Sequence, residues 1–232
     1  MKKIIFIGNS HTYMNDMPEL ARLMFENVTG ETCEVFMLAY SGRSLKWHME
    51  EEYFSVRFNI LYGGYDYCVI QEQAHPMTFE QYTEKNTDRI IQLCRQVNTT
   101  PVIFETWAEK TRPENQEEMN RRYRKIACEQ EILLAPIGEV WEKVIPALKD
   151  TSESDLYYRD GEHASPVGDF LTAMVIVKVI TGKLPGRDFL KAFDFTLPDD
   201  NWQPVKENAA DEEIQLSERV VNTIREQVEK YC

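Results

Sequence analysis

Short apolar, β-branched runs alternate with helical stretches of ten or more residues, and this alternation constrains the fold more than any other feature. Strands that alternate with helices build a parallel sheet whose two faces are both covered by helices. The sequence therefore predicts an α/β protein, a three-layer α/β/α sandwich of the flavodoxin-like type with about five parallel strands. The expected strands are residues 3–7, 33–39, 65–70, 101–107 and 132–136.

The stretches between these runs carry apolar residues at the spacing of one helical face. We expect residues 1–182 to form the α/β domain. Residues 183–232 would be a C-terminal extension whose final helix packs on the same domain. The expected helices are residues 17–28, 44–61, 79–97, 114–130, 137–149, 166–181 and 211–230.

Charge and hydropathy argue against several classes of partner. Lys and Arg (26) against Asp and Glu (39) give a net charge of -13, which repels nucleic-acid backbones and anionic membranes. No stretch approaches the roughly 20 apolar residues of a membrane span, and the segment before Gly8 is too short for a signal-peptide core. We expect a cytoplasmic protein with a small-molecule substrate and no nucleic-acid or membrane partner. A homo-oligomer stays open.

The sequence also predicts neither a metal nor a cofactor. Five cysteines occur without a C-x-x-C pair, and Cys33, Cys68 and Cys94 lie in apolar runs, where cysteine behaves as a small hydrophobic residue. A G-x-G-x-x-G motif and a Walker loop are both missing. A flavin or nucleotide binder would share the expected architecture, but the first loop lacks the phosphate cradle that such a site needs.

Two polar segments carry candidate chemistry. Ser10 follows the first expected strand in "IFIGNSHT", and His163 follows Asp160 by three residues in "DGEHASPVG". In such a loop the carboxylate can orient the imidazole and leave its other nitrogen facing a serine nucleophile. Ser10 could instead only cap a helix, and "HASP" could be a helix start capped by Ser165.

These two segments resemble the first and last sequence blocks of the SGNH (GDSL-like) hydrolase superfamily, which are esterases on a flavodoxin-like three-layer fold. The resemblance covers roughly residues 1–182. It implies that Ser10 is the nucleophile, His163 the base and Asp160 the acid of a catalytic triad. It is closer to the members related to carbohydrate acetylesterases.

The resemblance also implies an oxyanion hole. "AYSGRSL" fits the second block and places Gly42 as a backbone donor, whereas "QEQAHP" departs from the G-x-N-D pattern of the third block. On strand alternation Gln71 and Gln73 point the same way; we expect Gln73 to be the second donor, with Gln71 and His75 as alternatives. The expected function is a serine esterase that hydrolyses a short-acyl ester through an acyl-enzyme. The alternative is a catalytically inactive binding protein of this fold.

Overall fold

Five strands form one sheet in the order β2-β1-β3-β4-β5, and every neighbouring pair is parallel. The strands are β1 (Lys2–Gly8), β2 (Cys33–Ala39), β3 (Tyr67–Gln71), β4 (Thr100–Phe104) and β5 (Leu133–Ala135). The structure is a computed structural model that describes residues 1–74, 80–149, 155–190 and 216–232. The predicted α/β class and parallel five-stranded sheet are confirmed.

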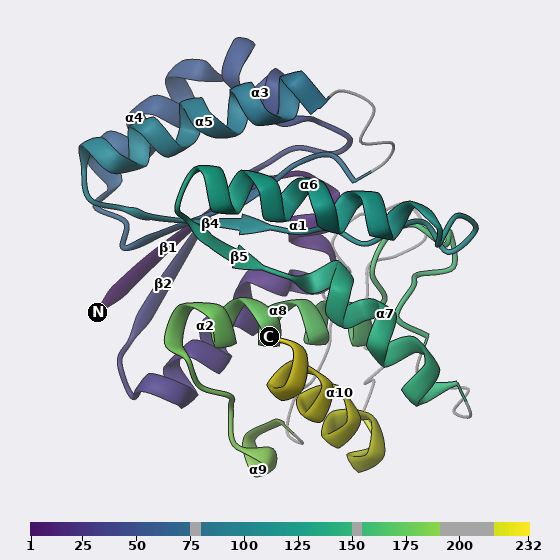
Figure 1. Ribbon diagram of the computed structural model, residues 1–232. Helices are drawn as coiled ribbons and strands as arrows, with labels where there is room; N and C mark the ends of the chain where they lie inside the picture. The colour runs from purple at the N-terminus through teal and green to yellow at the C-terminus, as the bar shows by residue number, and fades with distance from the viewer. Residues whose placement is uncertain (75–79, 150–154, 191–215) are drawn as a thin grey trace, which may run out of the picture.

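Helices cover both faces of the sheet (Figure 1). Because side chains alternate along a strand, Ile4 and Phe6 belong to one apolar cluster, and Ile5 and Ile7 belong to the other. The first face is covered by α2 (Met17–Thr29), α7 (Ile137–Leu148), α8 (Pro166–Thr181) and α10 (Glu218–Tyr231). The second is covered by α3 (Leu45–Glu50), α4 (Tyr53–Gly63), α5 (Glu80–Gln96) and α6 (Asn115–Glu129).

Three short helices complete the described elements: α1 (Ser10–Tyr13), the 3-10 turn η1 (Met14–Asp16) and α9 (Arg187–Leu190). The final helix, α10, packs against α7 and α8 (Figure 1), with Val220, Val221, Ile224 and Val228 buried in the first core. The expected start of this helix at residue 211 lies outside the described residues. None of the helices in the described ranges is both long and apolar enough to cross a bilayer.

Two elements differ from the sequence-based expectation. The single helix expected over residues 44–61 is divided into α3 and α4, because Glu52 leaves the helical conformation and accepts a hydrogen bond from Ser55 Oγ. The strand expected over 101–107 ends at Phe104, so Trp107 lies beyond the sheet and not on its alternating pattern.

The order of the strands decides where polar loops meet. β1 lies between β2 and β3, so the chain leaves β1 toward one face of the sheet and reaches β3 from the other. Ligands of open parallel sheets bind at such a switch point, outside the carboxyl ends of the strands. In this protein the segments that follow β1 and β3 come together there.

Candidate active site

The turn after β1 presents Ser10 at the start of α1. Asn9 caps this short helix, since its Oδ1 accepts the N–H of His11 (3.0 Å). The end of β3 holds the same turn from the side: Gln71 Oε1 accepts the N–H of Asn9 (2.8 Å) and the hydroxyl of Thr12 (2.9 Å). The position of Ser10 is therefore fixed by the cap of its own turn and by the end of the neighbouring strand β3.

Gly8 is required by this arrangement. A Cβ atom at residue 8 would lie 2.4 Å from both Gln71 Oε1 and Thr12 Oγ1, well inside van der Waals contact. Its carbonyl oxygen accepts a hydrogen bond from Nε2 of the fully buried His48 (2.7 Å). Burial lowers the pKa of His48 despite the opposing effect of this bond, so the neutral imidazole supports the turn from behind.

The structure brings together the three residues that the sequence placed in a triad. Ser10 Oγ lies 2.8 Å from His163 Nε2, although the two residues are 153 positions apart. His163 Nδ1 lies 2.7 Å from Asp160 Oδ2. A carboxylate only accepts, so the Nδ1 atom carries the proton, and the unprotonated Nε2 atom can accept the hydroxyl proton of Ser10.

The carboxylate of Asp160 is held in place by its own loop. Its Oδ1 accepts the N–H groups of Glu162 (2.9 Å) and His163 (3.0 Å), while Oδ2 faces the imidazole. Burial raises the pKa of Asp160, but these backbone bonds and the contact with His163 outweigh it and bring the pKa below its usual value. Asp160 is thus kept ionised, as an orienting acid must be.

Trp107 supports the loop that carries His163. Its Nε1 donates to the carbonyl oxygen of Glu162 (2.8 Å), and its ring stacks on Trp141 at 4.1 Å with an interplanar angle of 3°. Trp107 is fully buried, so it packs beneath the site and does not line a substrate pocket. His11 is also buried and contacts both residues: its ring centroid lies 5.3 Å from that of Trp107 and 4.5 Å from that of His163.

A buried polar pair also joins the segment that follows Ser10 to the segment that follows His163. Asn15 Nδ2 donates to the carbonyl oxygen of Ala164 (3.1 Å) and to Asp169 Oδ2 (2.7 Å). Asn15 adopts a left-handed conformation (φ 48°), which suits its place between the nucleophile turn and α2. Burial raises the pKa of Asp169 well above its usual value. No sequence pattern indicated this pair, because its members are 154 residues apart.

Gly42 lies in the loop next to the nucleophile. It occupies the third position of the turn Tyr40–Arg43, closed by a 3.1 Å bond, and has a positive φ of 67° that favours glycine. Asn9 Nδ2 donates to the carbonyl oxygen of Arg43 (3.0 Å) and so ties this loop to the turn that carries Ser10. Within the described part of the chain, the Gly42 N–H has no hydrogen-bond partner.

The segment after β3 differs from the expectation that Gln71 and Gln73 point the same way. The strand ends at Gln71, whose amide is buried and donates to the Glu72 carbonyl oxygen while its oxygen holds the Ser10 turn. Gln73 is exposed, and its N–H donates to Glu72 Oε1 (2.7 Å). The alternative donor His75 lies outside the described residues.

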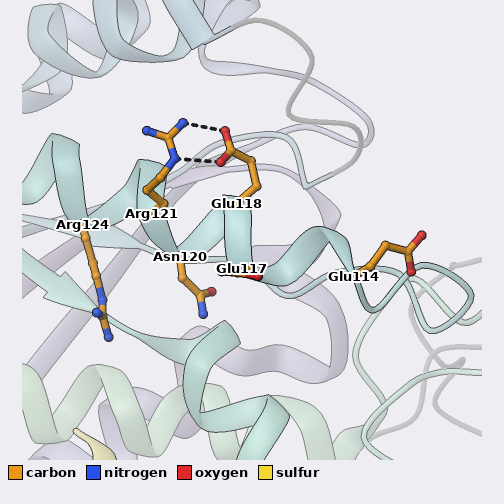
Figure 2. A pocket seen from close by; sticks show the side chains of 6 residues that line it. All are labelled: Glu114, Glu117, Glu118, Asn120, Arg121 and Arg124. Atoms are coloured by element: carbon orange, nitrogen blue, oxygen red, sulfur yellow. Dashed lines mark hydrogen bonds and ion pairs between the residues drawn. The ribbon is translucent and has the colours of Figure 1, made fainter.

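A surface hollow of about 590 Å³ is distinct from these residues (Figure 2). It is lined by charged and polar side chains of α6 and the residue before it: Glu114, Glu117, Glu118, Asn120, Arg121 and Arg124. Its charges pair locally, as between Glu118 and Arg121 (2.6 Å) and between Arg124 and Glu139. It contains none of the predicted site residues.

No cluster of His, Cys, Asp and Glu side chains suited to a metal ion occurs among the residues that the structure describes. All five cysteines are free thiols, and Cys33, Cys68 and Cys94 are buried as their apolar surroundings predicted. The groups gathered around Ser10 are a hydroxyl, imidazoles, carboxylates and amides, which can perform nucleophilic and acid–base chemistry.

Comparisons with known proteins agree with the fold. No protein-family model matches the sequence, and no curated protein matches it. Among solved structures, a member of the lipolytic protein G-D-S-L family from Veillonella parvula aligns with a TM-score of 0.59 at 14% identity, over 78% of this chain and 99% of that chain. Esterase EstA from Pseudoalteromonas sp. gives 0.58 at 11% identity, over 78% and 98%.

A carbohydrate esterase family 3 protein from Talaromyces cellulolyticus gives a TM-score of 0.57 at 11% identity, over 78% of this chain and 97% of that chain. The chain thus has the three-layer fold of the GDSL/SGNH hydrolases, and the resemblance seen in its sequence motifs is confirmed at the level of fold. Identities this low carry the fold and not the reaction.

Proposed function

We propose that the protein is a serine hydrolase that cleaves a carboxylic ester through an acyl-enzyme. The observation that carries the proposal is the continuous hydrogen-bonded chain from Ser10 Oγ through His163 to Asp160, with distances of 2.8 and 2.7 Å. These three hydrogen-bonded residues lie at the switch point of the parallel sheet, where ligands of such folds bind. Because the esterase structures share so little sequence identity with this protein, they support the fold and not the reaction.

In the first half-reaction, His163 Nε2 accepts the Ser10 proton as Ser10 Oγ attacks the ester carbonyl carbon. Asp160 stabilises the imidazolium that forms and keeps Nδ1 protonated. The imidazolium then gives its proton to the departing alkoxide, and the acyl group stays on Ser10. In the second half-reaction His163 deprotonates a water molecule, which attacks the acyl carbon. The bond from that carbon to Ser10 Oγ then breaks, the imidazolium returns its proton to Ser10, and the carboxylic acid leaves.

The carbonyl oxygen gains negative charge in both steps, so the site needs preorganised N–H donors. We assign this role to the Gly42 backbone N–H and the Gln73 side-chain amide. Support for Gly42 comes from its unpaired N–H within the described residues and from the Asn9 bond that ties its loop to the nucleophile. Support for Gln73 comes from its exposed side chain on the loop after β3.

A short acyl group, such as an acetyl ester of a sugar or small metabolite, is the substrate class that we favour. The motifs resemble the members related to carbohydrate acetylesterases, and one structural neighbour is a carbohydrate esterase. Five free thiols suit a reducing compartment, which supports a cytoplasmic small-molecule substrate.

The test is a panel of p-nitrophenyl acetate, butyrate and octanoate with acetylated sugars, run on wild type and Ser10→Ala. We expect the acetate esters to be turned over fastest and Ser10→Ala to retain less than a few per cent of the activity. A fluorophosphonate should label wild type and not Ser10→Ala. Ser55→Ala, a serine on α4 that binds Glu52, is the matched control and should keep full activity and labelling.

The second candidate is a binding protein that has this fold without turnover. It is favoured by the segment after β3, where the Gln71 amide is buried and the Gln73 N–H is already bonded to Glu72. Turnover by wild type, or labelling of Ser10, would exclude it. Neither turnover nor labelling, in a folded protein, would exclude the esterase.

A further inference from the structure

Glu72 is a buried carboxylate that follows β3 directly. Its Oε1 accepts the N–H groups of Leu45 (2.9 Å) and Gln73 (2.7 Å), and its Oε2 accepts the hydroxyl of Thr83 (3.1 Å). Only 5% of the residue is exposed. All three partners donate, which fits an ionised carboxylate. Burial raises the pKa of Glu72, and the three hydrogen bonds oppose that effect.

These donors belong to three separate segments of the chain. Leu45 is the first residue of α3 and comes three positions after Gly42, while Gln73 lies in the loop after β3 and Thr83 lies in α5. One carboxylate therefore joins the Gly42 loop to the loop that carries Gln73. Burying a carboxylate costs free energy unless donors satisfy it, and here donors from all three segments do so.

The Gly42 loop is exposed at its tip and is held at its two ends, where Tyr40 N–H donates to the Gly8 carbonyl oxygen (3.2 Å) and the Arg43 guanidinium lies over the Trp47 ring. A Cβ atom built at Gly42 would meet no atom within 4 Å, and residues 41–43 are exposed. Two further bonds tie it to the candidate site: the bond from Asn9 Nδ2 to the Arg43 carbonyl oxygen, and the bond from Leu45 N–H to Glu72. The Asn9 bond fixes the loop relative to Ser10, and the Glu72 bond fixes it relative to Gln73.

We propose that Glu72 is a positioning residue that sets the relative placement of the two loops meant to stabilise the oxyanion. This inference rests on the proposed esterase function. Because a misplacement of about 1 Å can cost roughly a hundredfold in rate, loss of this anchor should act mainly on kcat.

Two conservative substitutions separate geometry from charge. In Glu72→Gln the amide oxygen can accept both backbone N–H groups while Nε2 donates to Thr83 Oγ1, so all three bonds survive without the charge. In Glu72→Asp the charge stays, but the side chain is one methylene shorter and cannot reach every partner. Glu72→Ala removes the anchor completely.

Glu105 offers a matched control at the end of the next strand. It follows β4 as Glu72 follows β3, is fully buried, and accepts a backbone N–H, that of Glu139 in α7 (3.0 Å). Burial also raises its pKa. Among the residues that the structure describes, Glu105 makes no hydrogen bond to the Gly42 loop or to Gln73, so Glu105→Gln and Glu105→Ala report the general cost of altering a buried carboxylate.

The experiment measures kcat and KM for p-nitrophenyl acetate in all these variants, below the melting temperature of each. We expect Glu72→Ala to lower kcat about a hundredfold and Glu72→Asp at least tenfold, with KM changed less than threefold. Glu72→Gln should stay within fivefold of wild type, and the Glu105 variants within threefold. If Glu72→Ala does not fold, the comparison of Gln with Asp decides: equal kcat in those two variants would overturn the proposal.

A second readout does not depend on catalysis. Amide hydrogen exchange at Leu45 and Gln73 should speed up in Glu72→Asp and stay near wild type in Glu72→Gln. Faster exchange with unchanged kcat would overturn the positioning role. A wild type without turnover or Ser10 labelling would refute the esterase function instead, and with it the role of Glu72 in that reaction, while exchange would still report whether the anchor exists.

Discussion

Replacement of Asp160 by asparagine changes the protonation of the site while keeping its shape. Asp160 Oδ1 accepts two backbone N–H groups, from Glu162 and His163, and Oδ2 accepts His163 Nδ1–H. In Asp160→Asn the amide oxygen must stay with the two N–H donors, which turns the NH2 group toward the imidazole. His163 Nδ1 must then accept, and the ring proton moves to Nε2, where it faces Ser10 and removes the base.

The size of the effect follows from those two backbone bonds. To restore the productive tautomer the amide would have to flip and place its NH2 group against two N–H donors. Each lost bond costs about 1–2 kcal/mol in a partly exposed loop, hence about 2–4 kcal/mol together. That corresponds to about a thirtyfold to a thousandfold loss in rate. Loss of the charge that stabilises the imidazolium adds to it, so we expect kcat to fall about a thousandfold, and no more than about ten-thousandfold.

The assay is single-turnover and steady-state hydrolysis of p-nitrophenyl acetate by purified Asp160→Asn, with melting temperature as a check on folding. His163→Ala should lose more activity, because it removes the base itself. Asp155→Asn is the control: Asp155 belongs to the same surface region and pairs with Lys110, so it removes an equal charge without touching the triad. A loss smaller than tenfold in Asp160→Asn would refute the tautomer argument and reduce the triad to a dyad.

Further outcomes are expected at four side chains. Gln71→Ala should lower the free energy of unfolding in urea by about 1–3 kcal/mol, since it leaves the buried Asn9 N–H unpaired, and should also reduce kcat by loosening the Ser10 turn. Gln73→Ala should lower kcat about a hundredfold or more with little change in melting temperature, because its side chain is exposed. The raised pKa of Asp169 means that the folded state holds the carboxyl proton more tightly than the unfolded state does. The free energy of unfolding of wild type should therefore fall as pH rises from about 4 toward that pKa, by up to about 1.4 kcal/mol per pH unit. Asp169→Asn should remove this pH dependence in urea titrations. The lowered pKa of Asp160 has the opposite effect on stability: its stabilisation is present above the unfolded-state pKa and is lost as pH falls through the folded-state pKa. The melting temperatures of wild type and Asp160→Asn should therefore converge below about pH 4.

These outcomes have clear opposites. A Gln71→Ala variant as stable as wild type would show that the Asn9 bond is replaced by water. An unchanged kcat in Gln73→Ala would remove Gln73 from the oxyanion hole and leave Gly42 with another donor. A pH dependence of stability that persists in Asp169→Asn would assign the titration to a different buried group. Melting temperatures of wild type and Asp160→Asn that stay apart at low pH would show that Asp160 is not the group whose stabilisation is lost there.

The sequence by itself determined the features that depend on near neighbours in the chain. The alternation of short β-branched runs with helical stretches sufficed for a parallel five-stranded sheet, because secondary structure follows local periodicity. The contact of Asp160 with His163 was also predictable, since the two residues are three positions apart in one loop. The placement of Ser10 at the carboxyl end of β1 follows from the same local pattern, because Ser10 comes two positions after the last residue of that strand.

Tertiary structure alone decided what surrounds Ser10. Gln71 serves as an inward support and Glu72 as a buried anchor because the loops after β1 and β3 meet at the switch point, and neither role leaves a periodic signal in the sequence. Asn15 and Asp169 are 154 positions apart in the chain, and the buried Trp107 donates to the carbonyl oxygen of Glu162 in the loop that carries His163. Buried polar groups must find partners wherever the fold brings them, so their roles depend on long-range contacts that local patterns do not encode.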